Sequence, residues 1–95
     1  MATVVAGDFE WDGDKDQSNQ QKHGVGFAEA ATVFADPMAL YLDDGSGTER
    51  MVVIGTSLRE RLLFIVHVQR GVRDRIISAR KAGPAEREAY ENGGR

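Results

Sequence analysis

The sequence predicts an α+β fold in which an antiparallel β-sheet carries helices on one face. Three apolar runs typical of strands follow one another at residues 50–57, 61–70 and 74–80. Two segments with helix signals precede them, at residues 13–23 and 27–35. Short links between successive strands favour hairpins, which make a sheet antiparallel. A chain of 95 residues has room for one domain, and we assign residues 1–95 to it.

The N-terminal part is predicted to hold a short strand and a polar helix. Residues 1–7 are interpreted as a loose lead-in, and Phe9 and Trp11 then alternate with acidic residues, as in a strand with one apolar face. Asp12 can cap a helix over residues 13–23, and Gly24 is placed to end it. Because that helix is almost wholly polar, only its placement against the rest of the fold could hold it.

A second helix is predicted over residues 27–35. Phe27, Ala30, Ala31 and Phe34 share one face. Pro37 ends the helix at Asp36, because a residue before proline avoids the helical region. Residues 38–43 follow as a strand, and residues 44–47 as a turn.

The later strands suggest which residues point toward the helices. In residues 61–70 the wholly apolar face is expected to meet them; it holds Leu62, Phe64, Val66 and Val68. In the last strand Ile77 and Ala79 are expected inward, and Ser78 and Arg80 outward. The alternation in residues 50–57 favours neither face. A helix over residues 84–91 and a loose tail at 93–95 complete the predicted order β-α-α-β-β-β-β-α.

Composition excludes several classes of protein. Without cysteine there is no disulfide scaffold, thiolate nucleophile or cysteine-based zinc site. No apolar run approaches the ~20 residues that span a bilayer, and the start lacks a basic signal-peptide region, so we expect a cytoplasmic protein.

Charge is divided unevenly along the chain. Residues 1–49 hold 10 acids and 2 bases, whereas residues 50–95 hold 10 bases and 5 acids, so the halves carry net charges of −8 and +5. This asymmetry fits contact with a polyanion, and it fits equally well two halves that pair with each other.

The predicted outward sheet face carries basic side chains that suit a phosphodiester backbone. Guanidinium groups match phosphate oxygens two at a time, and histidine titrates near neutral pH. The alternative is that these are solvated ends of ordinary amphipathic strands. The side chains on or near this face are Arg61, His67, Gln69, Ser78 and Arg80, with Arg50, Arg70, Arg73 and Arg75 close by.

Two short pairs could also carry chemistry. Lys22 and His23, before Gly24, can supply a cation and a general acid or base, or can simply cap a helix C-terminus. Glu49 and Arg50 can be a carboxylate held by its own guanidinium, or an exposed pair of little effect. The only other histidine is His67, and no ligand spacing supports a metal site.

Several segments in fixed order resemble the BrnT toxins. The resemblance covers about residues 9–91 and rests mainly on FEWD at 9–12, KHGV at 22–25, FAEAATVFADP at 27–37, IGTS at 54–57 and RIISARKA at 75–82. It implies a RelE-like fold and a toxin of a type II toxin–antitoxin system that cleaves RNA and inhibits translation in the bacterial cytoplasm. It also implies a ribbon-helix-helix antitoxin as partner, in a 2:2 complex that reaches operator DNA only through the antitoxin.

The resemblance further implies a metal-independent endoribonuclease without cofactors, in which a ribose 2′-hydroxyl attacks the adjacent phosphate. Glu49 or His23 would be the base or acid, and Arg61 and Arg80 would clamp the scissile phosphate. The alternative is a catalytically degenerate, toxin-like module that acts with the antitoxin in operon autoregulation. The implied catalytic residues are Lys22, His23, Glu49, Arg50, Arg61 and Arg80, and the implied RNA contacts are His67, Arg70, Arg75 and Ser78.

Overall fold

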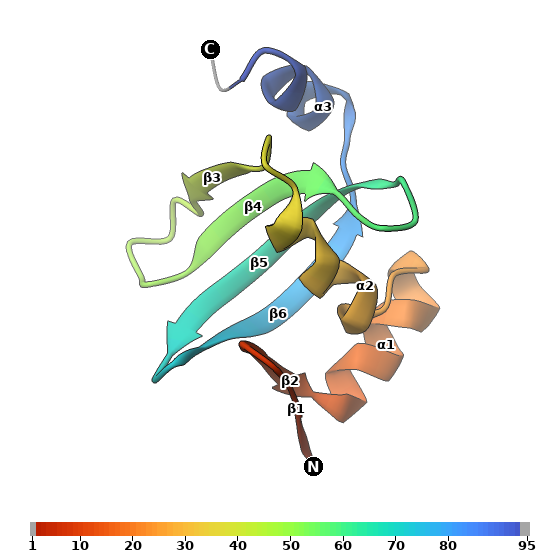
Figure 1. Cartoon of the computed structure of the whole chain (residues 1–95), viewed down its shortest axis with the longest axis vertical. Coiled ribbons are helices and arrows are strands. Elements are labelled where there is room, and N and C mark those ends of the chain that lie inside the picture. The colour runs from red at the N-terminus through yellow and green to blue at the C-terminus, as the bar shows by residue number, and fades with distance from the viewer. Residues whose placement is uncertain (1, 94–95) are drawn as a thin grey trace.

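A six-stranded sheet is the framework of the fold, as the computed structural model shows for residues 2–93 (Figure 1). The expected α+β class is confirmed. In chain order the elements are β1 (Thr3–Ala6), β2 (Phe9–Asp12), α1 (Gly13–His23), α2 (Phe27–Thr32), the 3₁₀ turn η1 (Val33–Ala35), β3 (Leu40–Asp43), β4 (Met51–Thr56), β5 (Leu62–Arg70), β6 (Arg73–Lys81) and α3 (Pro84–Glu91).

The strands lie in the order β1-β2-β6-β5-β4-β3 and form a mixed sheet. All neighbours are antiparallel except β2 and β6, which run parallel with Phe9 opposite Asp74. The prediction of a wholly antiparallel sheet is therefore wrong at this pair. A short hairpin link shows that two consecutive strands run antiparallel. β2 and β6 are far apart in sequence and no hairpin joins them, so the sequence gives no signal of their pairing or its direction.

The N-terminal segment is a strand where a loose lead-in was predicted. β1 pairs with β2, Ala6 opposite Phe9, and Gly7 in the intervening turn has a φ of 59°. Glycine adopts this left-handed conformation without steric cost, which suits a two-residue hairpin. All four residues of β1 are exposed, so its sequence needs no alternation of apolar and polar residues that would have predicted a strand. Of the predicted loose tail, residues 94–95 lie outside the described part of the chain.

The polar helix α1 is capped as predicted. Asp12 accepts a hydrogen bond from the Asp14 N–H at 2.9 Å, and Gly24 ends the helix with a φ of 69°. The buried Asn19 fixes the helix to β6, since its amide donates to the carbonyls of Val25 at 2.8 Å and Ala79 at 2.6 Å. Its oxygen accepts from the Ala79 N–H at 3.2 Å. One side chain thus satisfies both backbone groups of a β6 residue, as a neighbouring strand would.

The predicted helix at 27–35 is present, but its last turn is η1. Gly26 at its start offers no side-chain cap, and Asp16 of α1 accepts the Phe27 N–H at 2.8 Å instead. Phe27 and Ala30 are fully buried, and the helix ends at Asp36 as predicted.

The facing of β5 is the reverse of the prediction. Leu63 and Ile65 are fully buried in the main core with α2, whereas Leu62 and Phe64 lie on the other face with Tyr90 of α3. Both faces of the strand are apolar along half its length, so alternation could not distinguish them. In the main core, the single Trp11 of the chain meets Phe27 edge-on at 6.4 Å.

A register shift also changes the facing of β6. Val66 lies opposite Ser78 but His67 opposite Ile76, so Ile77 is left over. Ile76 and Ala79 therefore point into the core, and Ile77 does not take the inward position predicted for it.

The C-terminal helix α3 spans residues 84–91, as predicted, and has no buried residue. The Tyr90 hydroxyl donates to Asp36 Oδ2 at 2.6 Å and lies 3.2 Å from Thr56 Oγ1. Burial raises the pKa of Asp36, but hydrogen bonds from Thr56 and Tyr90 outweigh it and lower the pKa overall. No helix among residues 2–93 is long and apolar enough to cross a membrane.

Candidate functional site

The C-terminal end of α1 forms the centre of the candidate site. Lys22 and His23 line a hollow of about 180 Å³ together with Ser78 of β6. Asn19 sets this arrangement, since it joins α1 to the residue after Ser78. Three of the residues predicted for the site are thus brought together from two elements.

Arg61 lies beside this end of α1. Its Nη2 donates to the Gly24 carbonyl at 3.0 Å, and its Nε donates to Glu29 Oε2 at 2.9 Å. Nη2 also bonds Glu29 Oε1, so the two side chains form a fork. This hydrogen bonding lowers the pKa of Glu29 and raises that of Arg61. Arg61 therefore joins the β4–β5 hairpin to α1 and α2, while its Nη1 has no hydrogen bond to any residue from 2 to 93.

Arg80 is held on the other face of the sheet. Its Nη1 and Nη2 donate to the two carboxylate oxygens of Glu86 at 2.7 and 2.6 Å. The guanidinium also lies 4.1 Å from the centre of the Phe64 ring. This face carries α3, whereas α2 covers the opposite one. The predicted phosphate clamp of Arg61 and Arg80 thus consists of two side chains already paired with carboxylates.

Three predicted residues lie at the opposite end of the sheet. Glu49 and Arg50 are exposed just before β4, and Arg70 is exposed at the end of β5. Met51 pairs with His67, whereas Thr56 pairs with Leu62. Because Arg61 precedes Leu62, almost the whole of β5 separates Glu49 and Arg50 from Arg61.

His67 and Arg75 have partners inside the fold. His67 was predicted on the outward face but is buried, with Nδ1 3.0 Å from Asp74 Oδ1 and its ring edge-on to Phe34 at 4.9 Å. The prediction was wrong because β5 faces the other way. Arg75 Nη1 donates to Glu10 Oε2 at 2.6 Å and helps join β6 to β2.

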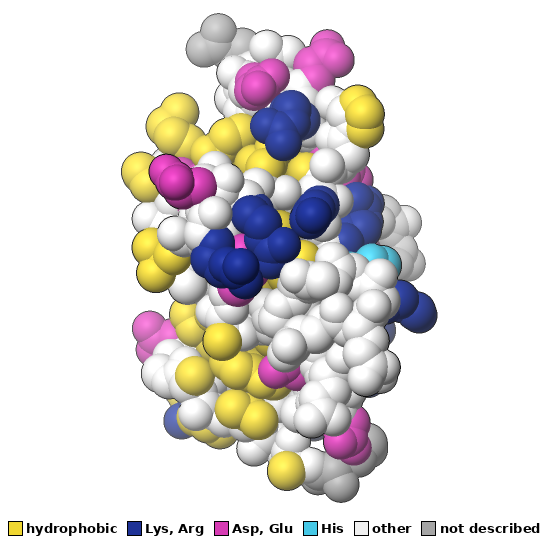
Figure 2. Space-filling view, turned by 90° about the vertical axis from the view of Figure 1, so that its right-hand side faces the viewer, with side chains coloured by type: hydrophobic (Ala, Val, Ile, Leu, Met, Phe, Trp, Pro, Cys, Tyr) yellow, Lys and Arg dark blue, Asp and Glu magenta, His cyan; other side chains and the backbone are white. Residues whose placement is uncertain are grey.

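A second hollow, of about 310 Å³, lies beside Arg61. Exposed Lys81 and Arg87 line it with Glu60, Arg61, Leu62 and Ala82. Figure 2 shows Lys and Arg side chains gathered across the middle of one face, with a histidine beside them. This cluster of cations lies on a chain whose net charge is −3.

The comparisons with known proteins identify the family. A family model described as the ribonuclease toxin BrnT of type II toxin–antitoxin systems matches residues 11–86. The chain belongs to the BrnT family. Its structure is similar to the crystal structure of the Brucella abortus ribonuclease toxin BrnT, at 25% sequence identity and a TM-score of 0.63. That match covers 77% of this chain and 92% of the other. A search of curated proteins finds no match.

Membership of the BrnT family makes the chain a ribonuclease toxin of a type II system and implies an antitoxin partner. The resemblance predicted from the sequence is therefore confirmed.

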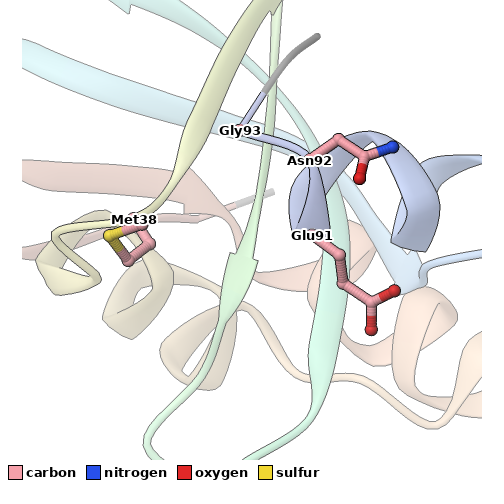
Figure 3. A pocket seen from close by; sticks show the side chains of 4 residues that line it. All are labelled: Met38, Glu91, Asn92 and Gly93. Atoms are coloured by element: carbon pink, nitrogen blue, oxygen red, sulfur yellow. The ribbon is translucent and has the colours of Figure 1, made fainter.

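A third hollow lies away from the residues predicted for the ribonuclease chemistry. Its volume is about 420 Å³, and it lies between Met38, before β3, and Glu91, Asn92 and Gly93 at the end of α3 (Figure 3). No cation lines it. No group of three or more His, Asp or Glu side chains that could hold a metal ion occurs within residues 2–93.

The sequence did not indicate the carboxylates that hold two of the candidate arginines. Glu29 accepts hydrogen bonds from Arg61 and, at 2.7 Å, from the Ser57 hydroxyl. Glu86 similarly fixes Arg80. The uneven charge of the two halves was the one signal of such pairing in the sequence. It is consistent with the pair of Arg61 and Glu29, which joins the basic half to the acidic half.

Proposed function

We propose that this chain is a single-domain, metal-independent endoribonuclease that cleaves RNA and so inhibits translation. The observation that supports it best is the hollow that Lys22, His23 and Ser78 line together. Beside it, Arg61 donates a hydrogen bond to the carbonyl of Gly24, the residue after His23. This end of α1 supplies a cation and an imidazole beside Arg61. Family membership supports the ribonuclease class.

The reaction is a transesterification that needs two proton transfers. His23 removes the proton of a ribose 2′-hydroxyl, whose oxygen bonds to the adjacent phosphorus while the bond from phosphorus to the 5′-oxygen breaks. Lys22 stabilises the added charge of the transition state and donates a proton to the leaving 5′-oxygen. The products are a 2′,3′-cyclic phosphate and a 5′-hydroxyl. Arg61 positions the end of α1 and offers Nη1 to the phosphate.

A cleavage assay tests the proposal. The purified chain is incubated with end-labelled RNA in EDTA, and cyclic-phosphate ends are measured. We expect cleavage in EDTA and a fall of about 10²-fold or more for His23→Ala, the range of general acid–base catalysis. Gln17→Ala, an exposed change on the same helix, is the control and keeps full activity. Activity that requires added metal, or an active His23→Ala, contradicts this mechanism.

We further propose that the partner is a ribbon-helix-helix antitoxin in a 2:2 complex in the bacterial cytoplasm, and that the fold is RelE-like. The type II assignment supports an antitoxin, which would reach operator DNA while the toxin does not bind it directly. Co-expression of both proteins should restore growth and yield a complex whose mass by light scattering fits two copies of each. A different stoichiometry contradicts the 2:2 assembly.

A second candidate function is a toxin-like module without catalysis that acts in operon regulation. The forks of Arg61 with Glu29 and of Arg80 with Glu86, together with the remote position of Glu49, favour it. Expression of the unmodified chain separates the two functions. Growth arrest that Lys22→Ala relieves supports the nuclease, whereas harmless expression with intact RNA supports the regulatory module.

A further inference from the structure

The second hollow holds two cations that the cleavage proposal does not use. Lys81 ends β6 and Arg87 lies on α3, and both are exposed. Neither forms an ion pair with any residue described between positions 2 and 93. By contrast, Arg61, Arg75 and Arg80 are all paired with carboxylates. Lys81 and Arg87 are therefore available to an outside anion.

Arg61 links the second hollow to the end of α1, which lines the first. Its side chain lines the second hollow, and its Nη2 reaches the Gly24 carbonyl, directly after the Lys22 and His23 that line the first. β6 also runs between the hollows, with Ser78 in the first and Lys81 in the second. Three residues of a strand span about 10 Å, which is roughly three stacked nucleotides.

We infer that the hollow of Lys81 and Arg87 binds phosphates that flank the scissile phosphate of a single-stranded RNA. The inference rests on the proposed ribonuclease function. Contacts to phosphates fix the position of a nucleic acid without reading its bases, so this hollow adds affinity and register and not sequence choice. The short separation from the end of α1 along β6 favours RNA over an acidic protein segment, because a strand bound at one hollow would extend to the other.

Glu60 opposes this binding, which provides a variant with the opposite expected effect. It is the one carboxylate among the residues that line the hollow. Its repulsion of phosphate should weaken RNA binding. Removal of the charge in Glu60→Gln should therefore strengthen binding, whereas Lys81→Gln and Arg87→Gln should weaken it.

The test compares cleavage of a single-stranded RNA by the double variant Lys81→Gln/Arg87→Gln with that by Gln69→Glu/Arg73→Gln. Both lower the net charge by two, but the second pair lies around the β5–β6 turn at the other end of the sheet. For the first we expect KM to rise about tenfold with kcat nearly unchanged, and the slope of log affinity against log salt to become shallower by about 0.7 per cation. For the second we expect a change in KM below about twofold, since its charges lie far from the hollow.

Binding of a 2′-O-methyl RNA, which cannot be cleaved, separates the possible failures. If the unmodified chain binds this RNA but cleaves no RNA, the proposed function fails, and the affinity of the variants still tests the hollow. Equal losses for both double variants would show a general charge effect and overturn the inference. Loss of antitoxin capture with unchanged RNA affinity would assign the hollow to a protein partner and would also overturn it.

Discussion

Asn19 shows how one polar side chain can fix a helix that has almost no apolar face. Its amide makes three hydrogen bonds, two of them to the backbone of Ala79. Buried backbone groups cost free energy when they lack partners. The sequence indicated that α1 depends on its placement, but it did not indicate which residue places it, because the partner is 60 positions away.

Replacement of Asn19 should be costly. Asn19→Ala leaves two buried carbonyls and one N–H without partners, so we expect a loss of about 2–4 kcal/mol in the free energy of unfolding, measured with urea. The exposed Gln17→Ala on the same helix should change it by less than about 0.5 kcal/mol. Equal stability of the two variants would show that Asn19 does not hold α1.

The fork of Arg61 with Glu29 predicts a pH dependence of stability. The pKa of Glu29 lies below its ordinary value of 4.5, chiefly because Arg61 donates hydrogen bonds to it. The folded state then favours the ionised form, so its contribution is complete above pH 4.5 and is lost as pH falls through the lowered pKa. Unfolding measured from pH 6 to 3 should show this loss, and Glu29→Gln should show a weaker dependence. An identical pH dependence in both proteins would contradict the role of the pair.

At the scale of elements, the sequence predicted features that depend on neighbouring residues, but it did not predict features that depend on residues far apart in the chain. Asp12, Gly24 and Pro37 mark helix ends through backbone preferences that act within a few residues. The parallel pairing of β2 with β6 and the facing of β5 depend on which surfaces meet after folding. The reversed facing moved His67 from the predicted RNA surface into the core, and with it one candidate for the site.

The helix α3 should open more readily than the sheet. It has no buried residue, and its side-chain anchors are Tyr90, bonded to Asp36, and Glu86, bonded to Arg80. Tyr90→Phe removes the first anchor, and we expect amide hydrogen exchange in residues 84–91 to become about tenfold faster while the core strands are unchanged. Equal acceleration throughout the chain would instead indicate loss of global stability.

The uneven charge of the chain has two outcomes in the whole molecule. Arg61 and Arg75 pair with Glu29 and Glu10 of the acidic half, so part of the asymmetry is satisfied inside the fold. Other bases of the basic half stay exposed in two places: Lys81 and Arg87 line the second hollow beside Arg61, and Arg50 and Arg70 lie at the opposite end of the sheet. The composition left open whether the basic half pairs with the acidic half or is free to contact a polyanion. The structure shows paired cations and exposed ones, and only the three-dimensional arrangement distinguishes the two groups.

The contact of Trp11 with Phe27 provides an optical probe of unfolding. Trp11 is the only tryptophan of the chain, and it is buried where β2 meets α2, in a core cluster that includes no residue of α3. Its fluorescence should therefore change when the main core opens and stay constant when only the C-terminal helix detaches. Emission and far-ultraviolet circular dichroism, recorded together during a temperature ramp, would distinguish these two events without any label.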